Sequence, residues 1–195
     1  MNTEVINMDR RTKYTQMVIK ETFIELLKEK AIKKITVSEI CEKADINRAT
    51  FYRYYLDVYD LLDKIEKDFV DKVKLASDDN TDYSVSTFAK DLLTAFTEDK
   101  DLAKVLFYTN DNNIYFLNDI MKLAYEKCKG KWQKDISNLP DEDVEYAASF
   151  IFNGALGIIN YWVLNDFDKS VDEIAQIIEK LAYYGIDKFI YKKRI

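Results

Sequence analysis

The chain has 195 residues, 48% of them hydrophobic and 14% aromatic, with four glycines and one proline, so long uninterrupted helices are expected. It contains no histidine, which excludes a Ser-His-Asp triad and a histidine-based metal site. A net charge of −6 argues against binding nucleic acid or an acidic membrane through bulk charge alone.

Charge is unevenly distributed along the chain. Residues 1–62 hold 11 Lys and Arg against 10 Asp and Glu, whereas the remaining residues hold 18 against 25. A surface that contacts phosphates is therefore expected in the first third. The N-terminal segment MNTEVINMDRR lacks the apolar core of a signal peptide, and Cys41 and Cys128 have no CxxC spacing, so a cytoplasmic protein is expected.

The first predicted helix runs from about Asp9 to Lys30, and its inward-facing residues include Val18, Phe23, Leu26 and Leu27. A short helix follows from Thr36 to Ala44. Thr36 and Glu39 have the spacing of a capping box, in which each side chain satisfies a backbone amide of the first turn. One face of this short helix is predicted to be buried, formed by Val37, Ile40, Cys41 and Ala44.

A second short helix is predicted from Asn47 to Tyr55, with Asp45 at the turn, Ile46 filling the corner and Asn47 as the cap. Phe51 and Tyr55 are four residues apart and can pack inward. The outward side chains are then Arg48, Ala49, Tyr52 and Arg53. Such a surface suits a DNA major groove, because arginine can donate two hydrogen bonds to guanine and a methyl group can contact thymine.

The segment TFYRYYLDVYDLL resembles the recognition-helix signature of the TetR family of regulators, and the resemblance covers roughly residues 10–70. It implies that Arg48, Ala49, Thr50, Tyr52 and Arg53 approach bases or adjacent backbone, that Tyr54 contacts phosphate, and that Thr36 and Ser38 hold phosphates. The expected DNA-binding residues are Thr36, Ser38, Asn47, Arg48, Ala49, Thr50, Tyr52, Arg53 and Tyr54.

Two positions depart from the family pattern. Asp45 stands where glycine is usual, but aspartate tolerates the left-handed turn conformation. Val58 stands where many members carry a lysine that binds phosphate. The cations that could replace this lysine are Lys28, Lys30, Lys33 and Lys34, or Arg10, Arg11 and Lys13.

Further helices are predicted from Asp57 to about Leu75 and over residues 83–97, 99–108, 112–136, 141–165 and 170–192. The fold class is therefore all-α, with about nine helices. We expect a helix-turn-helix DNA-binding domain over residues 9–70 and a helical effector-binding and dimerisation domain over residues 71–195. The acidic stretch Asp78, Asp79 and Asp82 lacks the glycine and the glutamate that a calcium loop needs, so no metal site is expected.

Tyr146 to Asn165 is a run of twenty residues without charge, which is about the length that spans a bilayer. Asn153 and Asn160 lie inside it, acidic clusters flank both ends, and no Lys or Arg anchors either side. A helix buried between other helices or between two subunits explains the run better, so no membrane association is expected.

Phe150 to Leu181 resembles the end of a TetR subgroup, in which a glycine-containing hydrophobic helix reaches a tryptophan and a short loop leads to the last helix. This resemblance implies a homodimer with a four-helix interface. The expected interface residues are Ala147, Gly154, Ala155, Ile174, Ile177, Ile178 and Leu181. An ordinary intramolecular core is the alternative interpretation of these residues.

In the TetR family the middle helices usually enclose an effector pocket. The candidates are aromatic side chains with a few polar groups, namely Phe107, Tyr108, Tyr115, Phe116, Tyr125, Asn153, Tyr161 and Trp162. Aromatic residues at helical spacing are more often core than pocket. No cofactor is expected, and the effector is an unknown small molecule or protein.

The sequence thus predicts a homodimeric regulator that binds a palindromic operator, most simply a repressor released by a small-molecule effector. A transcriptional activator of the same fold remains an alternative. So does a partner-binding co-regulator that has lost useful DNA affinity. A helical enzyme that uses carboxylate, tyrosine or cysteine groups is disfavoured, because histidine and a phosphate-binding loop are absent.

Overall fold

The computed structural model describes residues 3–77, 84–108, 114–135 and 141–191. Within these ranges the chain forms nine α-helices and one 3-10 turn, without a strand. The first elements are α1 (Thr3–Glu29), η1 (Ile32–Lys34), α2 (Val37–Lys43), α3 (Arg48–Tyr52) and α4 (Val58–Ala76). The others are α5 (Val85–Glu98), α6 (Lys100–Tyr108), α7 (Ile114–Asp135), α8 (Asp141–Leu164) and α9 (Val171–Tyr191).

The all-α fold class and the nine helices are confirmed, and most helix ends lie within three residues of their predicted positions. The largest difference is at the N-terminus, where α1 begins at Thr3 rather than near Asp9. The segment TEVINM contains neither glycine nor proline, so nothing in it interrupts a helix. The η1 turn was not predicted, since its three residues are too few to show a period.

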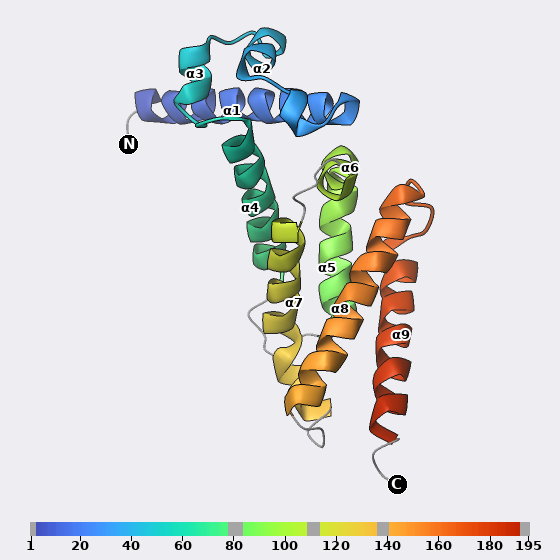
Figure 1. Cartoon of the computed structure of the whole chain (residues 1–195). Coiled ribbons are helices and arrows are strands. Elements are labelled where there is room, and N and C mark those ends of the chain that lie inside the picture. Colours follow the sequence, from blue (N-terminus) through green and yellow to red (C-terminus); the bar gives the residue numbers. More distant parts are fainter. Residues whose placement is uncertain (1–2, 78–83, 109–113, 136–140, 192–195) are drawn as a thin grey trace.

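The molecule has two parts, as Figure 1 shows. We call α1, α2, α3 and the first half of α4 the head, and the rest of α4 together with α5 to α9 the body. In Figure 1, α2 and α3 lie on one side of α1, and the body extends from the other side. The helix α4 belongs to both parts, so it is the direct covalent connection between them.

Each part has its own hydrophobic core. Phe23, Leu26 and Phe51 are completely buried in the head. On α4, Ile65 belongs to the head's core and Phe69 to the body's core, so the two cores meet between these residues. Val18, expected to face inward, is half-buried, and its neighbour Ile19 is completely buried instead.

The head also rests on α6 of the body. Val105 of α6 is 1% exposed and packs into the head's core. Nearby, the Lys28 ammonium of α1 lies 2.8 Å from the Asp101 carboxylate of α6. This contact and α4 give the head two attachments to the body, so a movement within the body has two routes to the head.

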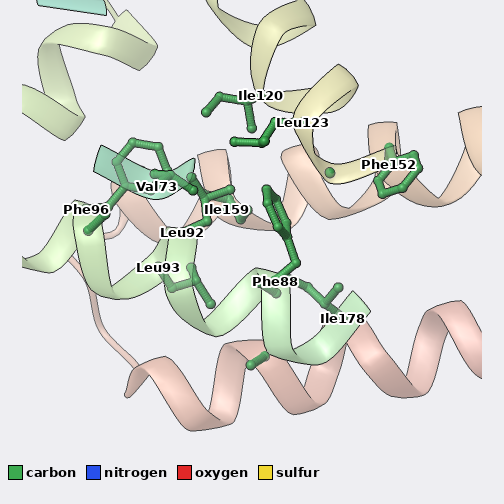
Figure 2. Close-up of a cluster of buried hydrophobic side chains, with 14 of the residues drawn as sticks. Val73, Phe88, Leu92, Leu93, Phe96, Ile120, Leu123, Phe152, Ile159 and Ile178 are labelled. Atoms are coloured by element: carbon green, nitrogen blue, oxygen red, sulfur yellow. The ribbon is translucent and has the colours of Figure 1, made fainter. Parts of the chain in front are cut away.

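The core of the body lies around α5 and includes buried residues of α4, α6, α7, α8 and α9 (Figure 2). Figure 2 shows Phe88 and Leu92 of α5 directed toward Ile120 of α7 and Ile159 of α8, with Ile178 of α9 on another side. Cys128 is 1% exposed in this core, and burial raises the pKa of its thiol to about 12. The thiol therefore remains protonated and unreactive at neutral pH.

Part of α8, Asp143–Leu164, is long and apolar enough to cross a membrane by length and composition alone, and 33% of its most apolar window is buried in the chain. Phe152, Ile159 and Trp162 face the core, and the Trp162 Nε1 donates a hydrogen bond of 2.8 Å to the carbonyl of Lys169. Tyr146 and Tyr161, on the opposite face, are 75% and 67% exposed. The uncharged run thus has about a third of its residues in the core, and the rest are half-buried or exposed.

Candidate nucleic-acid interface

The N-terminus of α2 is fixed by Thr36, whose Oγ1 accepts a hydrogen bond of 3.2 Å from the amide of Glu39. The Glu39 carboxylate accepts a hydrogen bond of 2.6 Å from the Lys30 ammonium at the end of α1. That hydrogen bond is the main reason why the pKa of Glu39 is lowered. The predicted cap therefore also joins α2 to α1.

The turn between α2 and α3 has the geometry that its residues predict. Asp45 has a φ of 50°, in the left-handed region that glycine usually occupies, so the aspartate does support the turn. The Asn47 side chain caps α3 by accepting a hydrogen bond of 2.8 Å from the amide of Thr50. Ile46 is half-buried against the head's core between these two residues.

The helix α3 buries one side and exposes the other. Phe51 is completely buried and Tyr55, just after the helix, is 3% exposed. The outward side chains are Arg48, Ala49, Tyr52 and Arg53, which we call the recognition surface. Tyr52 is 54% exposed, and its ring packs edge-to-face with the ring of Phe51. The recognition surface belongs to a helix that lies across α1 from the body, so the body does not cover it (Figure 1).

Several of the other predicted DNA-binding residues lie next to this surface. The Arg48 guanidinium donates a hydrogen bond to Ser38 Oγ of α2, which brings residues of both short helices together. Thr36, Ser38 and Asn47 are exposed, whereas Thr50 and Tyr54 are half-buried. Thr50 Oγ1 donates a hydrogen bond of 3.0 Å to Asn47 Oδ1, so Thr50 is partly committed to the cap.

The corner between α3 and α4 depends on a residue that the sequence did not single out. The Lys64 ammonium donates hydrogen bonds of 2.9 Å to the carbonyl of Tyr54 and 2.8 Å to the carboxylate of Asp60. The Asp60 carboxylate also accepts a hydrogen bond of 2.8 Å from the amide of Leu56. Asp60 and Lys64 have the i, i+4 spacing of a helix ion pair, which was the available signal.

Val58 cannot take the role of the lysine that many family members carry at its position, because it is 7% exposed and packs into the head's core. Two of the cations considered as replacements are held in ion pairs: Lys30 with Glu39, and Lys28 with Glu25 and Asp101. The other five are exposed, namely Arg10, Arg11 and Lys13 on α1 and Lys33 and Lys34 on η1.

The structure does not bring together the six predicted effector-pocket residues whose side chains it describes. Phe116 and Trp162 are each 1% exposed and pack in the core, while Asn153 and Tyr161 are exposed on α8. Phe107 and Tyr125 are half-buried against the core. The side chains of Tyr108 and Tyr115 lie outside the described residues, as does the acidic stretch at 78–82.

A cavity lies between α5, α7, α8 and α9, and it is lined by none of the six predicted residues whose side chains the structure describes. It has a volume of about 30 Å³. Its lining includes Phe88 and Leu92 of α5, Met121 and Cys128 of α7, Phe152 of α8 and Ile178 of α9. Sequence reasoning selected mostly aromatic residues, which lie on α6, α7 and α8, but residue type does not say which side of a helix borders a cavity.

The outer face of α8 and α9 carries exposed apolar residues. On α8, Tyr146, Phe150, Tyr161 and Leu164 are at least 53% exposed, and on α9 Leu181 is 59% exposed. A groove of about 400 Å³ runs along this face and is lined by Gly154, Gly157 and Tyr161 of α8 and Ile174 and Ile177 of α9. A Cβ added at Gly154 or Gly157 would meet nothing within 4 Å in the single chain.

The predicted dimer residues divide between this outer face and the core. Gly154 and Leu181 are exposed, and Ala147, Ala155 and Ile177 are half-buried. Ile174 is 4% exposed at the floor of the groove. Ile178 is 2% exposed and lines the inner cavity, so it packs in the chain's own core rather than on the outer face. The reason is that α9 packs closely along α5, so that α5 covers part of the apolar side of α9.

An all-helical chain with two short capped helices, a tight turn and an exposed second helix belongs to the helix-turn-helix class of DNA-binding proteins. Residues 21–65 match the family described as "Bacterial regulatory proteins, tetR family", and residues 83–184, more than half of the chain, match "Transcriptional regulator C-terminal region" of the TetR type. The chain therefore belongs to the TetR family of transcriptional regulators, a class of proteins that are not enzymes.

Two curated relatives are similar to the chain. The dhaKLM operon transcriptional activator DhaS of Lactococcus lactis is 30% identical over 117 residues, which are 60% of this chain and 54% of DhaS. The regulator YxbF of Bacillus subtilis is 24% identical over 175 residues, which are 84% of this chain and 43% of YxbF. The chain thus matches about half the length of these relatives.

A solved TetR regulator from Streptococcus agalactiae superposes with a TM-score of 0.68 at 19% identity, over 91% of this chain and 98% of that one. At this identity the likeness establishes the fold. It confirms the all-α fold, with an N-terminal helix-turn-helix part followed by a helical C-terminal part.

Proposed function

We propose that the chain is a sequence-specific DNA-binding transcriptional regulator that binds a palindromic operator as a homodimer in the cytoplasm. The observation that carries the proposal is the recognition surface. It combines two arginines, a tyrosine and a small side chain on a helix that lies across α1 from the body. A helix with one such exposed side fits a major groove, whose base edges carry the sequence information.

In this proposal Arg48, Ala49, Tyr52 and Arg53 contact base edges or the adjacent backbone. Arg48 is suited to a guanine, since its guanidinium can donate to both acceptors of that base. The Ala49 methyl group is suited to thymine. Thr36 and Ser38, at the start of α2, would contact phosphates together with the backbone amides of that helix end, and Tyr54 would do so beside α3.

The outer face of α8 and α9 is proposed as the dimer interface. Its support is the run of exposed apolar side chains and the open space above Gly154 and Gly157, where a partner helix could approach closely. Two subunits related by a two-fold axis would present two recognition surfaces to successive major grooves, about 34–36 Å apart. The operator would then be palindromic.

We further propose that an effector, most simply a small molecule, shifts the population between arrangements of the heads that fit the operator and arrangements that do not. Repression is the proposed outcome in the absence of the effector. Activation is the second candidate, because the relative DhaS is named a transcriptional activator. The sign depends on where the operator lies relative to the promoter.

Selection of bound fragments from genomic DNA by the purified full chain tests the DNA-binding proposal. We expect enrichment of a palindromic sequence, and a mobility-shift affinity for it that falls steeply as salt rises, because phosphate contacts release counterions. Enrichment of no sequence, with equally weak binding to all fragments, would overturn the proposal in favour of a co-regulator that acts through a protein partner.

A further inference from the structure

A groove lies where the head meets the body, on the side of α1 from which the body extends (Figure 1). Its volume is about 400 Å³, and we call it the junction groove. The walls are α1 and α4, together with the end of α5 and the start of α6. It shares no lining residue with the small cavity between α5, α7, α8 and α9, so the two are separate places in the fold.

The lining of the junction groove is apolar where the helices meet. Met17, Glu21 and Ile24 recur every three or four residues and so form one stripe along α1. A facing stripe on α4 includes Ile65 and Phe69, which are buried, whereas Met17 is exposed. The groove therefore has a buried apolar floor and an apolar wall in contact with water. A ligand with an apolar body gains by covering that wall.

Charged side chains surround this apolar surface, three lysines and three carboxylates, namely Lys13, Lys20, Lys72, Glu21, Asp68 and Asp99. The lysines are already engaged. Lys20 of α1 forms an ion pair with Asp68 of α4. The Lys72 ammonium lies 2.5 Å from the Glu98 carboxylate, and Lys13 is not free either. A ligand anion would therefore have to compete with existing partners for each of these cations.

Two of the carboxylates have no cationic partner among the residues that the structure describes. Glu21 on the α1 wall is exposed, and it makes no ion pair within that part of the chain. Asp99, between α5 and α6, accepts a hydrogen bond of 2.9 Å from the amide of Leu102, which leaves its charge uncompensated. The excess charge of the groove is thus negative, and it attracts a cation.

We propose that the junction groove binds an organic cation, in which one ammonium group is attached to an apolar aromatic or aliphatic body. The ammonium contacts the Glu21 carboxylate, and Asp99 adds to the negative potential. The apolar body covers Met17, Ile24 and Leu102. A volume of about 400 Å³ suits such a molecule, since small-molecule sites commonly lie between domains and combine apolar walls with a few polar groups.

A ligand in this groove contacts the head and the body at once, because α1 belongs to the head, α6 to the body and α4 to both. Its occupation restrains how the head sits on the body, in addition to the ion pair between Lys20 and Asp68. For its regulatory meaning this inference rests on the proposed function, because the orientation of the head matters only if the head binds DNA. The binding itself requires no DNA.

Three probes with the same body and different charges test the ligand class on the full chain: phenylbutylammonium, phenylbutanol and phenylbutanoate. We expect the cation to bind about 2- to 5-fold more tightly than the alcohol, as exposed ion pairs allow, and the anion to bind more weakly than both. Added salt should reduce this preference, because the carboxylates are exposed. Equal affinities of the cation and the anion would overturn the proposal, as would the absence of binding by all three probes.

The variant Glu21→Gln removes the unpaired charge with little change of shape. It should lower the affinity for phenylbutylammonium about 2- to 5-fold and leave the affinity for phenylbutanol unchanged. Glu126→Gln makes the same change at an exposed position of α7 outside the groove and should alter neither affinity. If the two variants weakened the binding of the cation equally, the carboxylate of Glu21 would not be its partner, and the assignment would be overturned.

Methionine methyl groups report where the probe binds. Met17 lines the junction groove, and Met121 lines the small cavity of the body. In a chain with isotope-labelled methionine methyl groups, phenylbutylammonium should shift the NMR signal of Met17 and leave that of Met121 unchanged. Met17→Leu and Met121→Leu identify the two signals. A shift of the Met121 signal as large as that of Met17, or larger, would place the probe in the body and overturn the proposed site.

Operator binding separates this inference from the proposed function. A chain that shows the Met17 shift but selects no DNA refutes the proposed function and leaves the site intact. A chain that binds its operator but shows no Met17 shift at saturating phenylbutylammonium refutes the site alone. Where both bindings occur, an operator affinity that changes with phenylbutylammonium and not with phenylbutanoate supports the regulatory meaning, and an operator affinity that neither probe changes overturns it.

Discussion

At the scale of single residues, the hydroxyl group of Ser38 competes with DNA for the hydrogen bonds of Arg48. In the free protein its guanidinium donates to Ser38 Oγ, so Arg48 is already oriented along the surface between α2 and α3. A guanine that replaces this hydroxyl as acceptor offers two acceptor atoms instead of one. In the proposed complex this exchange would favour specific binding and would leave Ser38 Oγ free to contact a phosphate.

Arg48→Ala should therefore weaken discrimination at particular base pairs by about 1–3 kcal/mol, because a bidentate contact to a base is lost. Tyr54→Phe should weaken binding nearly regardless of sequence, because a phosphate contact carries no sequence information. Mobility shifts with the operator, single-base variants and random DNA measure both effects. An equal loss for Arg48→Ala on cognate and random DNA would contradict its role as a base reader.

The carboxyl group of Glu66 on α4 makes the stability of the folded chain depend on pH. It is half-buried, and burial, followed by the nearby charges of Asp63 and Asp119, raises its pKa from 4.5 to about 7. The folded chain therefore binds a proton more tightly than the unfolded chain. The stability contributed by protonated Glu66 is complete below pH 4.5 and is lost as the pH rises through about 7.

Glu66→Gln should remove this loss and raise the free energy of unfolding at about pH 8 by about 1–2 kcal/mol, since glutamine stays neutral while the buried carboxylate does not. Urea unfolding at about pH 5.5 and about pH 8 measures the difference. Lys67→Gln, at an exposed position of the same helix, is the control. If the free energy of unfolding of Glu66→Gln changed between the two pH values as much as that of the unmodified chain, Glu66 would be ionised without cost.

For single residues, the sequence predicted burial and exposure correctly where helical periodicity alone determines which side of a helix a residue lies on. Phe51 and Tyr55 are buried and Arg48 and Tyr52 exposed because a helix turns by a fixed angle per residue. The contacts of Lys64 with Tyr54 and of Arg48 with Ser38 join different elements, so their existence depends on how helices pack. Spacing along the chain does not contain that information.

At the scale of helices, Lys64 holds the corner that sets the direction of α3. Its ammonium bonds to the Tyr54 carbonyl just after α3 and to the Asp60 carboxylate, which in turn accepts from the amide of Leu56. This network fixes the end of α3 to the first turn of α4. Without it, the recognition surface would occupy a wider range of orientations.

Lys64→Met should lower operator affinity about 3- to 10-fold, because two hydrogen bonds worth about 1 kcal/mol each in the protein restrain the corner. The slope of affinity against salt should not change, since the ammonium is engaged within the head and need not touch phosphate. Lys67→Met removes an equal charge from the same helix and should have little effect. A decrease of about one in the salt slope for Lys64→Met would instead identify Lys64 as a phosphate contact.

The start of a helix could be predicted from the sequence at the residues that cap α2, α3 and α4. Thr36, Asn47 and Asp57 each accept a backbone amide at the start of a helix, and each start lies within one residue of its predicted position. The end of α3 was predicted at Tyr55 but lies at Tyr52, because the chain turns into the corner held by Lys64. A capping residue can be recognised from its neighbours in the sequence, whereas the end of α3 depends on contacts between different helices.

At the scale of the whole molecule, the pattern of apolar residues along α9 did not show which of them belong to the core and which to the outer face. Ile178 faces the cavity and Leu181 faces outward, although both belong to the same apolar pattern. The stripe on α9 is wide enough to contact α5 on one side and to leave exposed residues on the other. Only the packing of α9 against α5 decides which residues are left for a partner.

Those remaining residues support a prediction about assembly. Tyr161 of α8 and Leu181 of α9 are 67% and 59% exposed on the outer face. A double variant, Tyr161→Glu with Leu181→Glu, should convert a dimer into monomers, because a dimer would bury four unpaired charges. Sedimentation velocity measures the mass, and operator affinity should fall with dimerisation, since one head then binds a single half-site.

Leu75→Glu is the matched control for this prediction, because Leu75 is 86% exposed on α4 rather than on the outer face. It introduces the same carboxylate into an apolar exposed position and should leave both mass and operator affinity unchanged. If the double variant remained dimeric with full operator affinity, the two subunits would have to associate through another surface. The spacing of the two heads on DNA would then be set by that other surface, and the palindrome's half-site separation would not follow from α8 and α9.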